Sequence, residues 1–179
     1  MLKTLNSGTL YVVCGAVLYR VDNNGASTAL GTILGGGRVG MASNGTQVCI
    51  AAGAKGYIYT TTGGLVEITD SGYPGADTVT FIDGFFVFNN KNEAQNGQFF
   101  VSALNDGTSF NALDFASAER YEDRIVRVFA DHSQLLLFGE ESIEIWFNSG
   151  AADFAKAQLS NKGLALDGAL KRLTNPLCG

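Results

Sequence analysis

The charged stretch at residues 119–127 holds the side chains that come closest to a catalytic set. It contains three carboxylates and three guanidinium groups, on Glu119, Glu122, Asp123, Arg120, Arg124 and Arg127. A glycosidase cleaves its bond with two carboxylates, and arginine can clamp an anionic sugar. A run of mixed charge between two strands is also the usual composition of a solvated loop. We therefore expect a surface loop without catalytic residues, in which Arg120, Arg124 and Arg127 face a protein partner.

The other reactive side chains are isolated from one another. His132 is the only histidine, so a histidine-based metal site cannot be assembled and a Ser-His-Asp triad would depend on this residue. We expect it to occupy a turn. Cys14, Cys49 and Cys178 show no metal-ligand spacing, and their odd number indicates reduced thiols in a cytosolic protein. We expect Cys14 and Cys49 to be buried, and we expect no cofactor or metal.

One short motif predicts a tight turn. It resembles the Asp-box of sialidase-type propellers, with Ala103 where that motif has Ser, and its residues are Asn105, Asp106, Gly107, Ser109 and Phe110. In such a turn a side-chain oxygen bonds the backbone, the glycine adopts positive φ and the aromatic ring packs beneath. The motif is structural even in sialidases. We expect it to stabilise one hairpin.

The composition favours an all-β domain. Apolar residues make up 46% and charged residues 16% of 179 residues, which fits one folded domain with strands buried on more than one side. Twenty-three glycines against two prolines indicate many tight turns. The net charge of −5 disfavours direct nucleic-acid binding. We find no apolar run of membrane-spanning length and no convincing signal peptide.

An internal repeat organises residues 6 to about 148. A turn followed by a hydrophobic strand recurs at Asn6–Val13, Asn44–Ile50, Asp83–Phe88 and Asp131–Phe138. The starting points are 38, 39 and 48 residues apart, which is close to the length of a propeller blade. A strand is expected before and after each of these strands, and a weaker additional strand in the early repeats.

This pattern predicts antiparallel four-stranded meanders arranged as a partial or small β-propeller of about four blade-like repeats. The alternative is a β-sandwich, which also has short strands at regular spacing. We place the propeller-like domain at residues 1–150. Residues 151–179 break the repeat, and they are expected to form an irregular or weakly helical tail.

Several segments resemble the packaged-DNA stabilization protein family of short-tailed bacteriophages. The most distinctive is Gly97–Glu119, and other segments agree in the same order over roughly residues 15–155: Met41–Gln47, Lys55–Tyr59, Asp77–Asn89 and Gly139–Gly150. Family members are typically more than twice as long. The chain therefore looks like a family member truncated at both ends, and its last residues do not resemble the family continuation.

The resemblance implies a virion protein of the head-to-tail junction that closes the portal channel and retains packaged DNA, or a non-functional fragment of such a protein. It implies no catalysis, and partners among the adaptor, tail-needle and tail-fibre or spike proteins. The protein would occupy the virion, and the host cytoplasm before assembly. The alternative is a carbohydrate-binding or glycosidase-type propeller. We also expect a homo-oligomer, because an incomplete propeller leaves apolar sheet faces uncovered.

Overall fold

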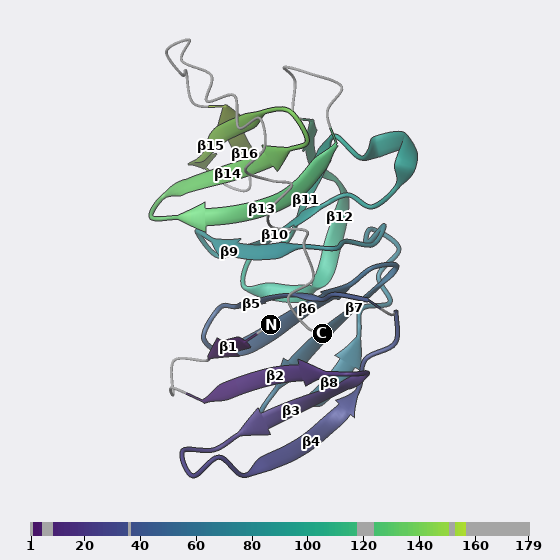
Figure 1. Ribbon diagram of the computed structural model, residues 1–179. Helices are drawn as coiled ribbons and strands as arrows, with labels where there is room; N and C mark the ends of the chain where they lie inside the picture. Colours follow the sequence, from purple (N-terminus) through teal and green to yellow (C-terminus); the bar gives the residue numbers. More distant parts are fainter. Residues whose placement is uncertain (1, 5–8, 36, 118–123, 151–152, 157–179) are drawn as a thin grey trace.

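Four antiparallel sheets, each of four strands in chain order, make up the computed structural model (Figure 1). The structure describes residues 2–4, 9–35, 37–117, 124–150 and 153–156. The first sheet contains β1 (Leu2–Thr4), β2 (Leu10–Cys14), β3 (Val17–Val21) and β4 (Ser27–Thr32). The second contains β5 (Gly40–Ser43), β6 (Gln47–Ala52), β7 (Lys55–Thr60) and β8 (Gly64–Glu67).

The third sheet contains β9 (Val79–Ile82), β10 (Phe85–Asn89), β11 (Gln98–Ala103) and β12 (Asp106–Ser117). A short 3₁₀ helix, η1 (Glu93–Gln95), lies between β10 and β11. The fourth sheet contains β13 (Ile125–Asp131), β14 (Gln134–Gly139), β15 (Ile143–Gly150) and β16 (Asp153–Lys156). No helix in these described segments is long and apolar enough to cross a membrane.

The residues just before the repeated hydrophobic strands form tight turns because they adopt positive φ. Asp83 and Gly84 adopt positive φ, at 50° and 90°, and connect Ile82 to its direct partner Phe85. This is the conformation that two-residue hairpins require, and Asp-Gly is one of the sequences that adopt it most readily. His132 also has positive φ, at 53°, in the turn between β13 and β14. The prediction that His132 is a turn residue is confirmed.

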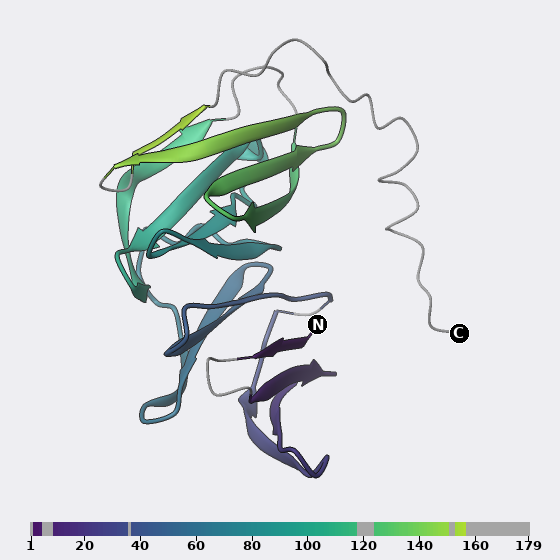
Figure 2. The same ribbon diagram turned by 90° about the vertical axis from the view of Figure 1, so that its left-hand side faces the viewer.

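The sheets follow one another through the molecule, with the first at one end and the fourth at the other in both ribbon views (Figures 1 and 2). The first strands of successive sheets are neighbours: β1 lies beside β5, β5 beside β9 and β9 beside β13. Side chains of β9 and the residue before it join two of these strands. Thr78 and Thr80 each accept a hydrogen bond through Oγ1, from the backbone N–H groups of Val128 and Ala130.

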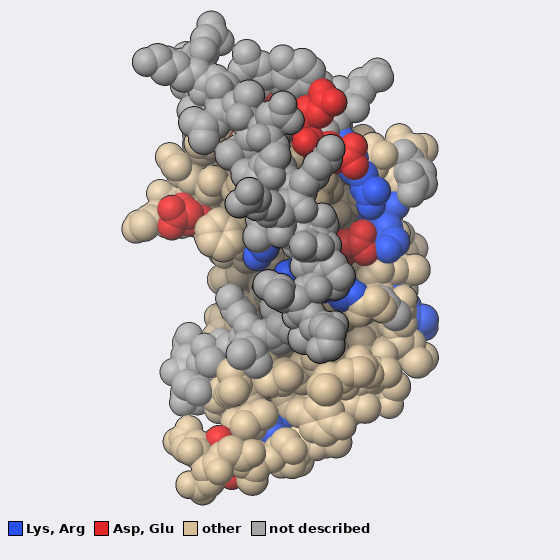
Figure 3. Space-filling model, viewed as in Figure 1, with Lys and Arg blue, Asp and Glu red and all other residues tan. Residues whose placement is uncertain are grey.

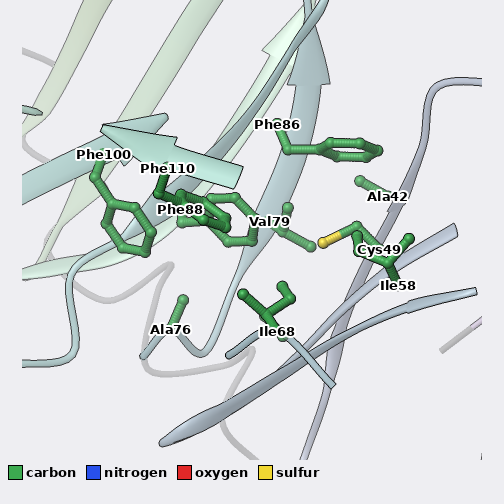
Figure 4. Packing of buried hydrophobic residues seen from close by; sticks show 11 residues of the cluster. Ala42, Cys49, Ile58, Ile68, Ala76, Val79, Phe86, Phe88, Phe100 and Phe110 are labelled. Carbon is green, nitrogen blue, oxygen red and sulfur yellow. The ribbon is translucent and has the colours of Figure 1, made fainter. Parts of the chain in front are cut away.

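Three apolar clusters fill the spaces between successive sheets. The middle cluster packs Phe86, Phe88 and Phe100 of the third sheet against Cys49 and Ile58 of the second (Figure 4). The rings of Phe88 and Phe100 stack with their centroids 5.0 Å apart. Burying several phenylalanines at one junction removes a large apolar area from water, so this contact stabilises the order of the sheets.

The sheets differ in how many of their faces are buried. In the second and third sheets, the interior residues of β6, β7, β10 and β11 are buried whichever face they occupy. In the fourth sheet, β14 alternates between buried and half-buried or exposed residues. Strand β3 of the first sheet buries only Leu18. The two end sheets therefore bury one face, and the two middle sheets bury both.

The all-β, propeller-like expectation is confirmed, because four separate sheets repeat in order rather than two sheets facing each other as in a sandwich. The domain boundary differs from the expected one. Strand β16 pairs with β15 through Trp146–Lys156 and Asn148–Phe154, so the fourth sheet extends past residue 150. The expected irregular tail otherwise lies outside the described residues, from 157 onward.

The two cysteines of the sheets do not share one environment. Cys49 is fully buried in the middle cluster, as expected, and burial raises the pKa of its thiol. Cys14 is exposed, so the expectation that it is buried was wrong. It pairs with Val17 at the end of β2, on the face of the first sheet that no other described sheet covers.

Candidate interaction sites

The charged stretch is only partly described. Glu119, Arg120, Glu122 and Asp123 lie outside the described residues, so the structure does not test whether they form a loop. Arg124 and Arg127 are described, and both are exposed. Figure 3 shows a surface that is mainly uncharged, with basic side chains gathered near acidic ones on one side.

Arg124 belongs to a charge cluster at the junction of the third and fourth sheets. Its Nη2 lies 3.9 Å from Oδ2 of Asp77, whose Oδ1 is 2.8 Å from Nζ of Lys91. Arg124 and Lys91 have side chains 46% and 42% exposed, so solvent screens both ion pairs. Two cations share one carboxylate here, which leaves a basic surface suited to an acidic group of a partner.

Arg127 lies on β13 beside exposed apolar side chains. Its guanidinium carbon is 6.0 Å from the centre of the Phe129 ring, at the outer limit of a cation–π contact. Phe129 is 44% exposed and Val126 is 38% exposed. Arginine next to exposed aromatic and aliphatic groups is typical of protein interaction surfaces. The arginine could be identified from the sequence, but Phe129 was missed because alternation along β13 does not reveal which face is covered.

The predicted Asp-box-like turn is a link between two sheets. Asp106 Oδ1 accepts hydrogen bonds from the N–H and Oγ1 of Thr108, at 2.9 and 2.6 Å. Those two bonds are local, as in the motif. The backbone N–H of Gly107, however, donates to Oε1 of Gln47 on β6, 60 residues away, and Asn44 Nδ2 donates to the carbonyl of Asn105. The turn of the third sheet is thereby held to the second.

Positive φ in this turn falls on Asn105, at 56°, and the expectation that Gly107 adopts it was wrong. Asparagine is the residue other than glycine that tolerates this region best. Gly107 is required for a different reason. A Cβ at this position would lie 2.4 Å from Cδ1 of Ile58 and 3.1 Å from the Phe86 ring, so glycine permits close approach of the two sheets.

The rest of the motif also contributes to that junction. Phe110 is 8% exposed, and its ring lies 5.6 Å from that of Phe88, which agrees with the expected buried aromatic. Ser109 is exposed on β12. Asp70, in the segment between the sheets, was not identified from the sequence, and its carboxylate accepts from the N–H groups of Gly72 and Phe110.

The two acidic side chains at this junction are both held in the charged form. Hydrogen bonds from Gly72 and Phe110 lower the pKa of Asp70. The hydrogen bond from the Thr108 hydroxyl lowers the pKa of Asp106. Asp70 accepts from Gly72 in its own turn and from Phe110 on β12, and Asp106 accepts from Thr108 in its own turn, so both carboxylates hold the backbone of these turns. Within the described ranges, no three His, Cys, Asp or Glu side chains gather as metal ligands.

The sequence that forms these four sheets matches a known family. Residues 4–165 match the family model described as the β-propeller of bacteriophage P22 Gp10. The chain belongs to this Gp10 family. The match runs from the last residue of β1 through β16 and assigns the chain to a bacteriophage structural protein family, in agreement with the resemblance found in its sequence. Comparison with curated protein sequences gives no match.

Solved structures of propeller proteins are similar in fold. A chain of the mitotic checkpoint complex is 12% identical, with TM-score 0.59, over 91% of this chain and 52% of that one. The N-terminal domain of Nup159 is 13% identical, with TM-score 0.58, over 95% and 45%. Hsv2 of Kluyveromyces lactis is 13% identical, with TM-score 0.57, over 87% and 50%. At these identities the likeness concerns the fold alone. The Gp10-family chain spans about half the length of these structures.

Proposed function

We propose that the chain is a structural protein of the head-to-tail junction of a bacteriophage, where it helps to close the portal channel and retain packaged DNA. The observation that carries this proposal is the family match over residues 4–165. The protein would act by filling space and contacting neighbouring virion proteins. Its place of action would be the virion, after a period in the host cytoplasm before assembly.

The charge of the chain is consistent with contact to proteins rather than to DNA. The net charge is −5, and a surface with this sign repels a phosphate backbone. The partners that we propose are the adaptor, tail-needle and tail-fibre or spike proteins of the same tail. Arg124 and Arg127, together with Arg120, would face such a partner, and Phe129 beside Arg127 supplies the apolar part of that contact.

The proposal is tested in phage particles that depend on this chain. Particles assembled without it should package DNA and then lose it, which nuclease treatment and electron microscopy of emptied heads would measure. Supplying the wild-type chain should restore retention, and the double variant Arg124→Glu, Arg127→Glu should restore it poorly. The double variant Arg20→Glu, Arg38→Glu is a matched control, since it changes the charge equally at two exposed arginines outside β13. Full DNA retention in particles lacking the chain would contradict the proposal.

We also propose that the chain has no catalytic activity of its own, against the alternative of a glycosidase-type or carbohydrate-binding propeller. The Asp-box-like turn, the feature that raised this alternative, is accounted for by its hydrogen bonds to the second sheet. Hydrolysis of a sialoside by the purified protein, abolished by Glu119→Gln or Glu122→Gln, would overturn the proposal.

A further inference from the structure

Three Asn-Gly pairs lie between elements of the sheets: Asn24–Gly25, Asn44–Gly45 and Asn96–Gly97. In such a pair, the glycine nitrogen can attack the side-chain carbonyl carbon of the asparagine, because glycine has no side chain to obstruct the approach. This reaction is one reason why asparagine is a thermolabile residue. Because the three pairs are chemically alike, their surroundings in the folded chain decide how fast each one reacts.

Asn24 lies at the tip of the β3–β4 hairpin, beyond its last pair of strand residues, Val21 and Ser27. In Figure 1 the loop between these two strands projects past the first sheet. Asn24 is exposed, and no hydrogen bond joins its side-chain amide to another described residue. Gly25 has φ of 84°, and a Cβ there would meet no atom within 4 Å. The amide can therefore turn toward the Gly25 nitrogen without losing a contact.

Asn44 also precedes a glycine, but its side chain is held. Its Oδ1 accepts hydrogen bonds from the backbone N–H and the hydroxyl of Thr46, each at 3.0 Å, and from the N–H of Gln47 at 2.7 Å. Its Nδ2 donates to Oε1 of Gln47 and to the carbonyl of Asn105, each at 3.4 Å. The amide must leave these partners before it can react, and each lost hydrogen bond raises the barrier.

The attacking nitrogens are matched in these two pairs. The N–H of Gly25 donates to the carbonyl of Asp22 at 3.0 Å, and the N–H of Gly45 donates to Oγ of Ser43 at 3.1 Å. Each nitrogen therefore releases one hydrogen bond before it attacks. The difference between the two pairs lies in the asparagine side chains.

Asn96 is held through its backbone rather than through its side chain. It is half-buried, and its carbonyl oxygen accepts a hydrogen bond from the N–H of Ile125 at 2.9 Å. This carbonyl belongs to the same peptide group as the Gly97 nitrogen. The peptide group must separate from β13 before that nitrogen can turn toward the side chain, so Asn96 should react more slowly than Asn24.

We propose that Asn24 is a site of spontaneous deamidation and isomerisation in the folded protein, and that the fold protects Asn44 and Asn96. The nitrogen of Gly25 bonds to Cγ of Asn24, the bond from Cγ to Nδ2 breaks, and the proton of Gly25 leaves with Nδ2 as ammonia. Water then opens the resulting succinimide at either of its carbonyl carbons, which leaves aspartate or isoaspartate. This inference rests on the geometry of the turns and is independent of the proposed function.

The reaction would loosen the β3–β4 turn. Asp22 Oδ1 accepts hydrogen bonds from the N–H groups of Asn24 and Ala26, at 2.9 and 2.8 Å. Isoaspartate at position 24 adds one carbon to the backbone inside this span, which moves the N–H of Ala26 away from Asp22. Both products also place a second carboxylate two residues from that of Asp22, and like charges repel.

Ageing the purified chain in mildly alkaline buffer at body temperature tests the assignment. Peptide mapping by mass spectrometry follows each pair, because conversion adds about 1 Da and isoaspartyl peptides elute separately. Asn24 should convert at least about ten times faster than Asn44, since the loss of several hydrogen bonds slows a reaction by that factor or more. In urea the three rates should become similar. Conversion of Asn44 or Asn96 as fast as that of Asn24 in the folded chain would overturn the proposal.

Variants at position 46 separate the effect of the hydrogen bonds from that of the sequence. Thr46→Val removes the hydroxyl that donates to Asn44, so it should speed conversion at Asn44 and leave the rate at Asn24 unchanged. Thr46→Ser retains a hydroxyl and is the matched control, with the wild-type rate at both sites. Circular dichroism should show the wild-type spectrum for both variants. An unchanged rate at Asn44 in folded Thr46→Val would mean that these bonds do not protect it.

Asn24→Gln tests the site itself. Glutamine forms the corresponding ring far more slowly, so ion exchange of the intact aged variant should show acidic forms accumulating much more slowly than in the wild type. Accumulation at the wild-type rate would show that the reactive position lies elsewhere in the chain.

Discussion

The two middle sheets and the two end sheets are built from similar sequences but differ in what covers them. Strand β10 in the third sheet is buried at all five positions, whereas β14 in the fourth alternates between buried and more accessible ones. Both strands are strongly apolar. Hydrophobicity along a strand therefore shows that a face can be buried, and the number of neighbouring sheets decides whether it is. The same apolar strand pattern therefore gives two buried faces in the middle sheets and one in the end sheets.

The largest expected difference between the two regions is in stability. Phe88 is fully buried in the third sheet, where its ring contacts those of Tyr73, Phe100 and Phe110. Phe88→Ala should lower the free energy of unfolding by about 3–5 kcal/mol, since it removes a large side chain and leaves a cavity. Phe147→Ala, at a side chain that is 42% exposed on β15, should cost less than about 1 kcal/mol.

Urea unfolding measures both values. Phe88→Leu serves as a conservative control and should lose less stability than Phe88→Ala. Equal losses for Phe88→Ala and Phe147→Ala would break the comparison, because they would mean that Phe147 on the fourth sheet is as well packed as Phe88 between the second and third sheets.

A smaller effect is expected at the closest approach of the second and third sheets. Gly107→Ala should cost about 1–3 kcal/mol, because its Cβ would lie 2.4 Å from Cδ1 of Ile58. Ile58→Val removes that carbon, at a cost of about 0.5–1.5 kcal/mol on its own. The double variant should then be at least about 0.5 kcal/mol more stable than the sum of the single costs predicts. Strict additivity would show that Ile58 is not what excludes a side chain at position 107.

The strand order could be predicted from the sequence because local signals carry it. A turn such as Asp83–Gly84 and the hydrophobic strand after it recur at steps of 38, 39 and 48 residues, and a four-stranded meander requires only contacts between neighbours in the chain. The short strand β16 was missed because Asp153–Lys156 contains one aromatic residue and no clear alternation. Its hydrogen-bonded pairing with β15 makes this segment a strand, although its own sequence does not predict one.

The role of the Asn105–Phe110 turn could be predicted only in part. The hydrogen bonds between Asp106 and Thr108 are local, so the motif reveals them. The bond from Gly107 to Gln47 joins residues 60 positions apart, and no local pattern indicates such a partner. Positive φ was assigned to glycine because glycine adopts it most readily, whereas Asn105 adopts it and leaves Gly107 free to meet Ile58.

The last prediction concerns the reactivity of two thiols rather than stability. Cys14 and Cys49 lie on an uncovered and a covered sheet face, so their modification rates compare the two kinds of face. Cys14 is exposed on the face of the first sheet that no other described sheet covers, and Cys49 is fully buried between the second and third sheets. In a Cys178→Ser background, a maleimide should modify Cys14 at least about 100 times faster than Cys49. Cys49 reacts only when the sheets open, which costs several kcal/mol, and burial also raises the pKa of its thiol.

Mass spectrometry of the modified peptides measures both rates, and unfolding in urea should make them equal. Similar rates in the folded protein would show that the junction of the second and third sheets opens as readily as the end of the molecule, and the distinction between middle and end sheets would then fail.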